Sequence, residues 1–181
     1  MPALFRRATR TQAPADVVAR AGLARGDKVL SAAHADDGTW LVASRTALVL
    51  VPPAEAADDD KVTTLPWQEI ESAGWNRDDD RFRVSEVGEY GRPRARHAFT
   101  LHEASELLAV VRERVTASVV LQRRVAVRGR RGLTVVARRA PNTDAALTWS
   151  YELDAGLDPD DPEVRDLAER GLRAAAEELG L

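Results

Sequence analysis

The sequence contains no cysteine and only two lysines among its 26 basic residues. The absence of cysteine excludes disulfide bonds, thiol nucleophiles and zinc sites with thiolate ligands. Long apolar runs are also missing, and the run at residues 47–51 is far shorter than the roughly 20 residues of a membrane-spanning helix. We therefore expect a cytoplasmic protein with no membrane insertion.

Motifs that carry catalysis or phosphate binding are absent as well. The glycines at residues 129–132 lack the Walker spacing and its lysine, and no Gly-x-Ser-x-Gly sequence occurs. His34, His97 and His102 show no spacing typical of a nucleophilic triad, and we interpret His102 and Glu103 as capping groups of a helix. We predict that the protein is not an enzyme and has neither a metal site nor a cofactor.

Two aspartate triplets, at residues 58–60 and 78–80, are the nearest approach to a cation site. Neither has the spacing of a calcium loop, with its glycine and distal glutamate, so we interpret both as solvated loop tips.

What the sequence does contain is a series of strands built around residues 38–53. Residues 39–43 and 48–51 are rich in β-branched and large apolar side chains, which suit a pleated and largely buried surface. The 181 residues, 44% hydrophobic and 30% charged, are sufficient for one globular domain with a smaller addition. Further strands are predicted at residues 28–35, 62–65, 71–76, 81–87 and 94–101, after a loose tail at 1–12 and a short helix at 15–21.

A long amphipathic helix is predicted to follow these strands, over residues 102–122. Thr100 and Glu103 have the spacing of a capping box, and apolar residues then recur at helical intervals. The end of the helix is left open, because its last turns are β-branched and residues 124–128 alternate as a strand does.

The C-terminal part is predicted to form a hairpin and a final helix. Residues 133–140 and 145–153 flank the turn signal Pro-Asn-Thr-Asp, and Trp149, Tyr151 and Leu153 fall on one face. Asp161 and Pro162 together form a strong helix start, since the carboxylate can cap the first turn and proline is tolerated there.

Three short motifs resemble the bacterial PH-like or GRAM-like domains, as found in small actinobacterial proteins. They are LVASRTAL at residues 41–48, LPWQEI at 65–70 and AGW at 73–75. The resemblance implies an α+β fold: a bent antiparallel β-sheet or barrel closed by a long amphipathic helix, with the C-terminal β-hairpin and helix added. The resemblance covers about residues 28–122, and the hairpin and helix after residue 130 are not part of it. We predict domains at residues 1–27 (tail and short helix), 28–128 (PH-like) and 129–181 (an extension packed on it).

The phosphoinositide binding known in that family is not expected here. The first hairpin loop, at residues 34–38, holds two aspartates where phosphoinositide-binding members have basic residues, and carboxylates repel a phosphate headgroup.

Charge is unevenly distributed along the C-terminal half. Residues 112–139 hold nine arginines against Glu113, a net charge of +8, while residues 152–169 carry −7. The basic segment could bind nucleic acid or another anionic partner. Alternatively the two segments neutralise each other, which we favour because Glu152 and Asp154 would return beside Arg130 and Arg131 of the hairpin. The candidate binding residues are Arg123, Arg124, Arg128, Arg130, Arg131, Arg138 and Arg139.

We therefore expect a non-catalytic PH-like protein-interaction module, whose partner is another protein or a second copy of the chain. The alternative is a nucleic-acid or anionic-surface binder that uses the arginine-rich segment. The net charge of −3 for the whole chain favours the first.

Overall fold

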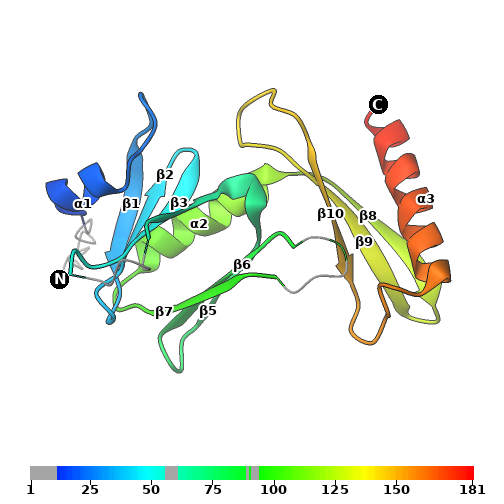
Figure 1. Ribbon diagram of the computed structural model, residues 1–181, viewed down its shortest axis with the longest axis horizontal. Coiled ribbons are helices and arrows are strands. Elements are labelled where there is room, and N and C mark those ends of the chain that lie inside the picture. Colours follow the sequence, from blue (N-terminus) through cyan, green and yellow to red (C-terminus); the bar gives the residue numbers. More distant parts are fainter. Residues whose placement is uncertain (1–11, 56–60, 89, 91–93) are drawn as a thin grey trace, which may run out of the picture. The chain divides into compact units, whose positions relative to one another are not determined.

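The computed structural model describes residues 12–55, 61–88, 90 and 94–181 (Figure 1). Within these residues the fold is α+β, with three α-helices and three antiparallel sheets, so the α+β part of the predicted fold is confirmed. The described strands form separate sheets and no closed barrel. Residues 1–11 of the predicted tail and the aspartates at 58–60 lie outside the described residues.

Contacts divide the chain into two compact units. Unit 1 comprises Met1–Leu65, Trp75–Phe82 and Ala98–Arg112. Unit 2 comprises Pro66–Gly74, Arg83–His97 and Glu113–Leu181. The domain boundaries predicted from the sequence stay a prediction.

Unit 1 is centred on the sheet that contains the stretch from residue 38 to residue 53. Its strand order is β1-β2-β3-β4. Every residue of β3 is buried, and side chains on both faces are covered, as the apolar sequence predicted. The bounds are α1 Ala15–Arg20, β1 Val29–His34, β2 Trp40–Ser44, β3 Ala47–Val51 and β4 Thr63–Pro66.

One face of this sheet is covered by α1. Val17 of the helix packs with Val42, Val49 and Val51, three β-branched residues that share that face. The turn from β1 to β2 contains Gly38 at φ 85°, where a Cβ would be strained and would also meet Pro53. Local turn chemistry and the continuous apolar sequence of the central strands therefore both favour this sheet.

A second sheet has the order β5-β6-β7, and its residues are divided between the two units. Pro66 ends β4 and precedes a 3-10 turn, η1 Trp67–Glu69, as expected of a residue that cannot donate to a β-ladder. The bounds are β5 Ile70–Asn76, β6 Arg81–Glu86 and β7 Arg96–Thr100.

The helix after β7 is shorter than predicted. It is α2 Ser105–Ser118, and residues 119–122 belong instead to a strand, β8 Val119–Arg128. The β-branched Val119 and Val120 suit the strand, whose pairing with β9 begins opposite Arg138. The predicted capping box was also wrong, because Thr100 ends β7 and the carbonyl of Ala104 accepts the first helical hydrogen bond, from Leu108 N.

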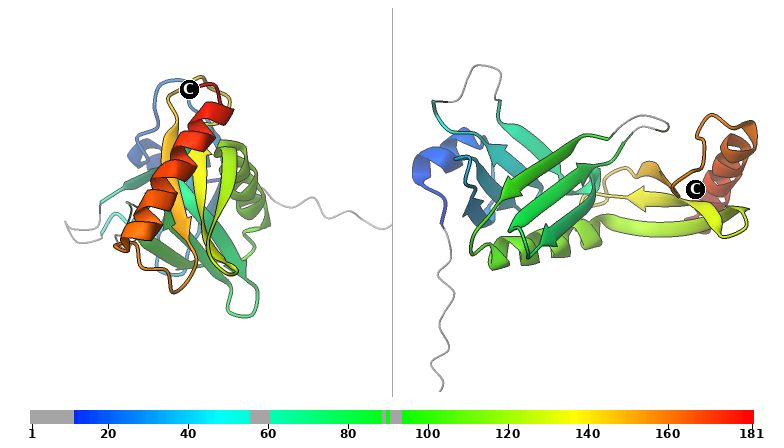
Figure 2. Two further views of the ribbon diagram at one scale, coloured as in Figure 1. Left: turned by 90° about the vertical axis from the view of Figure 1, so that its right-hand side faces the viewer. Right: turned by 90° about the horizontal axis from the view of Figure 1, so that it is seen from below.

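The third sheet, β10-β9-β8, lies in unit 2 with α3 across one face (Figure 2). The predicted hairpin is confirmed: β9 Arg131–Arg138 pairs with β10 Thr148–Leu153. The helix α3 Pro162–Glu178 begins as predicted, with Asp161 as its capping residue. Three side chains on one face of β10 pack with Val164 and Ala168 of α3: Trp149, Tyr151 and Leu153. The core of unit 2 therefore lies between this face of the sheet and α3.

Candidate functional site

The arginine-rich segment folds mainly as β8 and β9, and strand geometry divides its charges between two faces. Successive side chains of a strand point to opposite faces. Arg123 reaches α3, where its Nη1 donates to Glu178 Oε2 at 3.0 Å. Arg124 pairs instead with Asp154, which follows β10. The segment therefore does not present one continuous basic surface.

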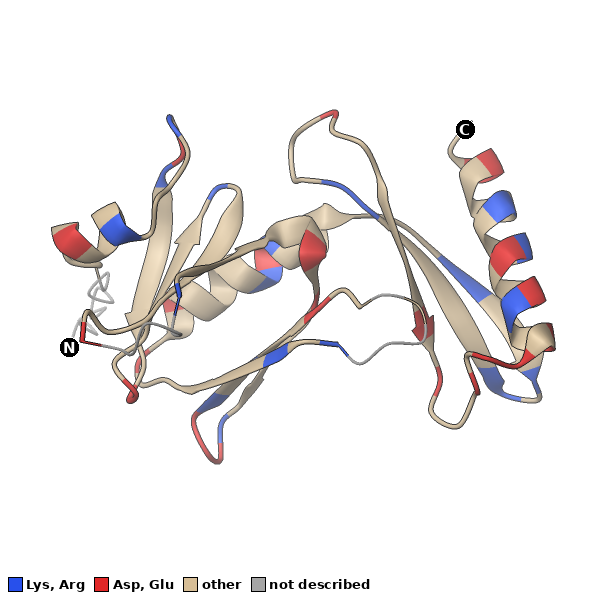
Figure 3. Cartoon of the chain, viewed as in Figure 1, with Lys and Arg blue, Asp and Glu red and all other residues tan. Residues whose placement is uncertain are grey.

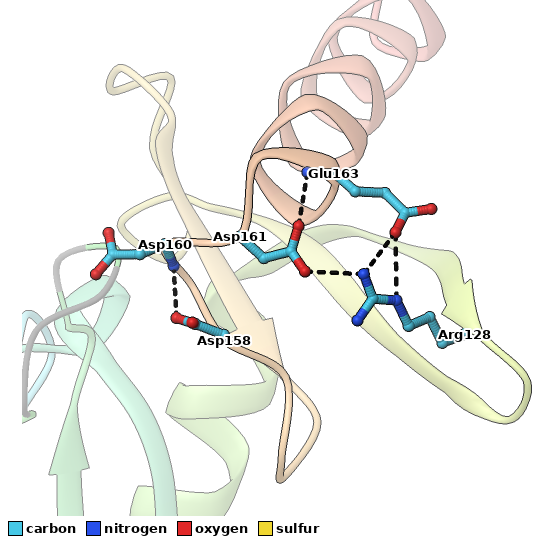
Figure 4. Close-up of polar contacts among 5 residues, drawn as sticks. All are labelled: Arg128, Asp158, Asp160, Asp161 and Glu163. Carbon is cyan, nitrogen blue, oxygen red and sulfur yellow. Dashed lines mark hydrogen bonds and ion pairs between the residues drawn. The ribbon is translucent and has the colours of Figure 1, made fainter.

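The last arginine of β8 binds the N-terminus of α3. Arg128 Nη2 donates to Asp161 Oδ2 at 2.8 Å and to Glu163 Oε2 at 2.7 Å (Figure 4). Asp161 Oδ1 simultaneously accepts from the backbone N–H of Glu163 at 2.9 Å, which caps the helix. One guanidinium thus joins the tip of the β8–β9 hairpin to the capped helix start.

Asp154 is the most strongly held carboxylate of the hairpin. Both of its oxygens accept from Arg124, and Oδ2 also accepts from the backbone N–H of Gly132 at 2.9 Å. These hydrogen bonds, with the charge of the neighbouring Arg131, lower the pKa of Asp154 from 3.8 to about 2. The carboxylate therefore stays ionised and committed to this contact in mildly acidic solution.

Arg138 is buried, with only 2% of its surface exposed. Its Nη2 donates to the backbone carbonyl of Glu71 at 2.9 Å, and its Nη1 donates to Ser118 Oγ at 3.3 Å. Glu152 lies 3.7 Å away. Burial lowers the pKa of Arg138, while the nearby carboxylates of Glu152 and Glu71 raise it. This arginine is a structural group and is not available to a partner.

The remaining candidate arginines differ from one another in exposure. Arg130 is exposed in the turn between β8 and β9, and Arg131 is exposed with its guanidinium against Gly156. Arg139 is half-buried beyond the end of β9. Figure 3 shows the basic tip of the β8–β9 hairpin next to acidic residues that lead into α3.

The expected neutralisation by the acidic segment is confirmed for three arginines, Arg124, Arg128 and Arg138. Sequence reasoning placed Glu152 and Asp154 beside Arg130 and Arg131. The register puts Leu153 opposite Leu133. Asp154 therefore binds Arg124, with Arg131 nearby, and Glu152 lies 3.7 Å from Arg138. A register of this kind cannot be read from charge counts.

Two of the histidines contact carboxylates of their own unit. His97 Nε2 lies 2.6 Å from Glu86 Oε1 across two neighbouring strands. His102 lies between two carboxylates, 3.2 Å from Asp36 Oδ1 and 3.3 Å from Asp80 Oδ2, rather than capping α2. Sequence reasoning missed both contacts of His102, because the aspartates are distant in the chain.

Two features are absent from the described residues. No group of three or more histidine, cysteine, aspartate or glutamate side chains there is arranged to hold a metal ion. None of the described helices has both the length and the apolar character needed to cross a membrane.

Comparisons with known proteins give no assignment for this geometry. No family model, no curated protein and no solved structure matches the chain.

Proposed function

We propose that the protein is a non-catalytic, PH-like protein-interaction module that binds an extended segment of a partner protein at the outer edge of β8. The observation that carries the proposal is the position of this ten-residue strand, which pairs with β9 on one side and is an edge of its sheet on the other. The main-chain groups at such an edge can accept a further strand.

The side chains at this edge are consistent with a partner segment rather than with nucleic acid. Val120 is 42% exposed, an unusual position for a large apolar residue of a strand. Three arginines of β8 have carboxylate partners within unit 2, so their charge is already compensated. Each would have to give up an ion pair before it could bind a phosphate.

The PH-like assignment is supported by the order of elements. Seven strands, β1 to β7, precede α2, as the resemblance of residues 41–48 and 65–70 leads us to expect. The hairpin of β9 and β10 with α3 then forms the addition.

A pull-down from native cells tests the edge of β8. Val120→Lys should abolish capture of a defined partner, because a lysine side chain on an edge strand opposes strand addition. Val62→Lys is the matched control, since Val62 is 38% exposed and lies outside β8. Equal loss of the partner in both variants, or in neither, would overturn the proposal.

Binding to DNA and RNA at two salt concentrations tests the alternative. The proposed function expects no measurable affinity. A nucleic-acid binder requires affinity that falls steeply with salt and weakens when Arg130 and Arg131 are both replaced by alanine. That outcome would replace the interaction module with the alternative.

A further inference from the structure

Unit 2 contains a pocket of about 330 Å³ between α3 and two tyrosines. Tyr90 and Tyr151 line it together with Arg165, Ala168 and Glu169 of the helix. This volume is at the lower end of the range for sites that bind small molecules or single side chains. The pocket is separate from the arginine contacts described above and from the edge of β8 at Val120.

The two tyrosine rings stand perpendicular to each other. Their centroids are 5.4 Å apart and their planes cross at 83°. Both side chains also pack against the apolar core between the sheet and α3, which fixes their position. Two aromatic rings at right angles, with a carboxylate beside them, form the kind of wall that attracts a cation to ring faces.

The charges around the pocket are negative in sum. Arg165 forms an ion pair with Asp160, with 2.6 Å between Nη2 and Oδ1. Glu169 lines the pocket, and Asp158 lies close enough to influence Tyr90. The other nearby cation, Arg94, is bound to Glu71 at 2.5 Å.

Three further charges lie near these groups. Asp161, which also influences Tyr90, is bound to Arg128. Arg173 lies 3.9 Å from Glu169, too far for a hydrogen bond, and both side chains are mainly exposed. The surroundings therefore favour a positive occupant over a negative one.

One polar atom of a lining residue also has no partner among the described residues. The hydroxyl oxygen of Tyr90 is buried and forms no hydrogen bond with the described residues. Leaving such a group unsatisfied costs about 1–3 kcal/mol. An N–H group of an occupant could donate to this oxygen while the positive charge faces the rings and Glu169.

We propose that this pocket binds an organic cation that carries an N–H donor, an ammonium or a guanidinium group. Two sources supply this chemistry: a lysine or arginine side chain of another protein, or a free amine or guanidine. The proposal does not depend on strand addition at β8.

The test is an NMR titration of the full chain with two blocked amino acids, N-acetyl-arginine methylamide and N-acetyl-lysine methylamide. At least one should shift the amide signals of residues 151 and 165–169, and the uncharged citrulline analogue should not. Failure of both cations at millimolar concentration, or equal binding of citrulline, would overturn the proposal.

Charge variants of α3 make the test specific. Glu169→Gln should weaken binding about threefold to tenfold, since it removes a charge from the wall of the pocket. Glu177→Gln is the matched control, an exposed residue of the same helix that does not line the pocket. Equal affinities in these two variants would also contradict the proposal.

Two further substitutions should change the affinity for the cation in opposite directions. Arg165→Gln should strengthen binding of the cation, because it removes the competing positive charge and releases Asp160. Tyr90→Phe should weaken it, because the acceptor oxygen is lost. Tighter binding after Tyr90→Phe, or weaker binding after Arg165→Gln in a chain that remains folded, would show that the occupant is not a cation with a donor.

A comparison of a peptide with a free ligand distinguishes the two sources of the cation, a side chain of another protein and a free amine or guanidine. A short peptide with a central arginine should bind at least several-fold more tightly than argininamide if the natural occupant is a side chain of a partner. Equal affinities would assign the pocket to a free amine or guanidine, which is the other form of the same proposal.

Discussion

The sheet of unit 1 and the sheet of unit 2 are stabilised differently. The β1–β4 sheet is covered by apolar side chains on both faces, with all of β3 buried. The β8–β10 sheet has an apolar face toward α3, whereas the other side of the hairpin holds Arg124 with Asp154 and the buried Arg138. Apolar burial is nondirectional, while hydrogen-bonded ion pairs require particular partners. We infer that burial provides stability in both units and that the arginines of unit 2 fix its register.

The largest effect should come from the apolar cores of both units. Leu48→Ala in unit 1 and Leu133→Ala in unit 2 each remove a fully buried side chain, so each should lower the free energy of unfolding by about 2–5 kcal/mol. Urea denaturation followed by tryptophan fluorescence measures both. If Leu133→Ala costs less than half as much as Leu48→Ala, ion pairs rather than burial hold unit 2.

The next effect should come from the buried arginine. Arg138→Ala removes the donors to Ser118 and Glu71 and leaves a cavity, and it should destabilise the protein by about 3 kcal/mol. Arg138→Met, which keeps most of the volume, should cost less. Equal losses in the two variants would mean that lost hydrogen bonds, not lost packing, dominate.

A smaller effect is expected where α3 meets the sheet. A Cβ at Gly171 would lie 2.7 Å from Val125 Cγ2 and 3.1 Å from Val135 Cγ2. The clash should cost about 1–3 kcal/mol and outweigh the gain of about 1 kcal/mol from alanine in a helix. Gly171→Ala should therefore lower the melting temperature, measured by circular dichroism. The double variant with Val125→Ala should recover part of the loss, and a more stable Gly171→Ala variant would contradict the tight contact.

The smallest effect is the pH dependence that arises at Asp154. Its pKa in the folded protein, about 2, is below its ordinary value of 3.8. As pH falls, Asp154 is therefore protonated in the unfolded chain before it is protonated in the folded protein. Its contribution to the free energy of unfolding is complete above pH 3.8 and is lost as the pH falls toward about 2. Asp154→Asn should give a flatter dependence of melting temperature on pH in this window. An unchanged slope in Asp154→Asn would refute the assignment.

Much of the local structure was predictable because it depends on neighbours in the chain. The continuous apolar runs at residues 39–43 and 48–51, the turn at Gly38 and the cap at Asp161 all act over a few residues. The end of α2 was not predictable to the same degree. Helical spacing and β-branching compete over residues 115–122, and pairing with β9 decides for a strand from Val119 onward.

The candidate sites were only partly predictable. The sequence identified the arginine-rich segment and the acidic segment that opposes it. It gave no signal that Arg138 would be buried, that His102 would meet two aspartates, or that Tyr90 and Tyr151 would share a pocket. Each of these depends on residues far apart in the chain.

By itself, the sequence determined the α+β class, most strands, the final capped helix and the exclusion of disulfides and thiolate chemistry. These follow from composition and from interactions between residues close in the chain. The tertiary structure alone decided which carboxylate each arginine meets and that the two tyrosines stand at right angles beside Glu169. A shift of one residue in strand register moves every side chain to the opposite face, so long-range pairing, not charge content, determines these partners.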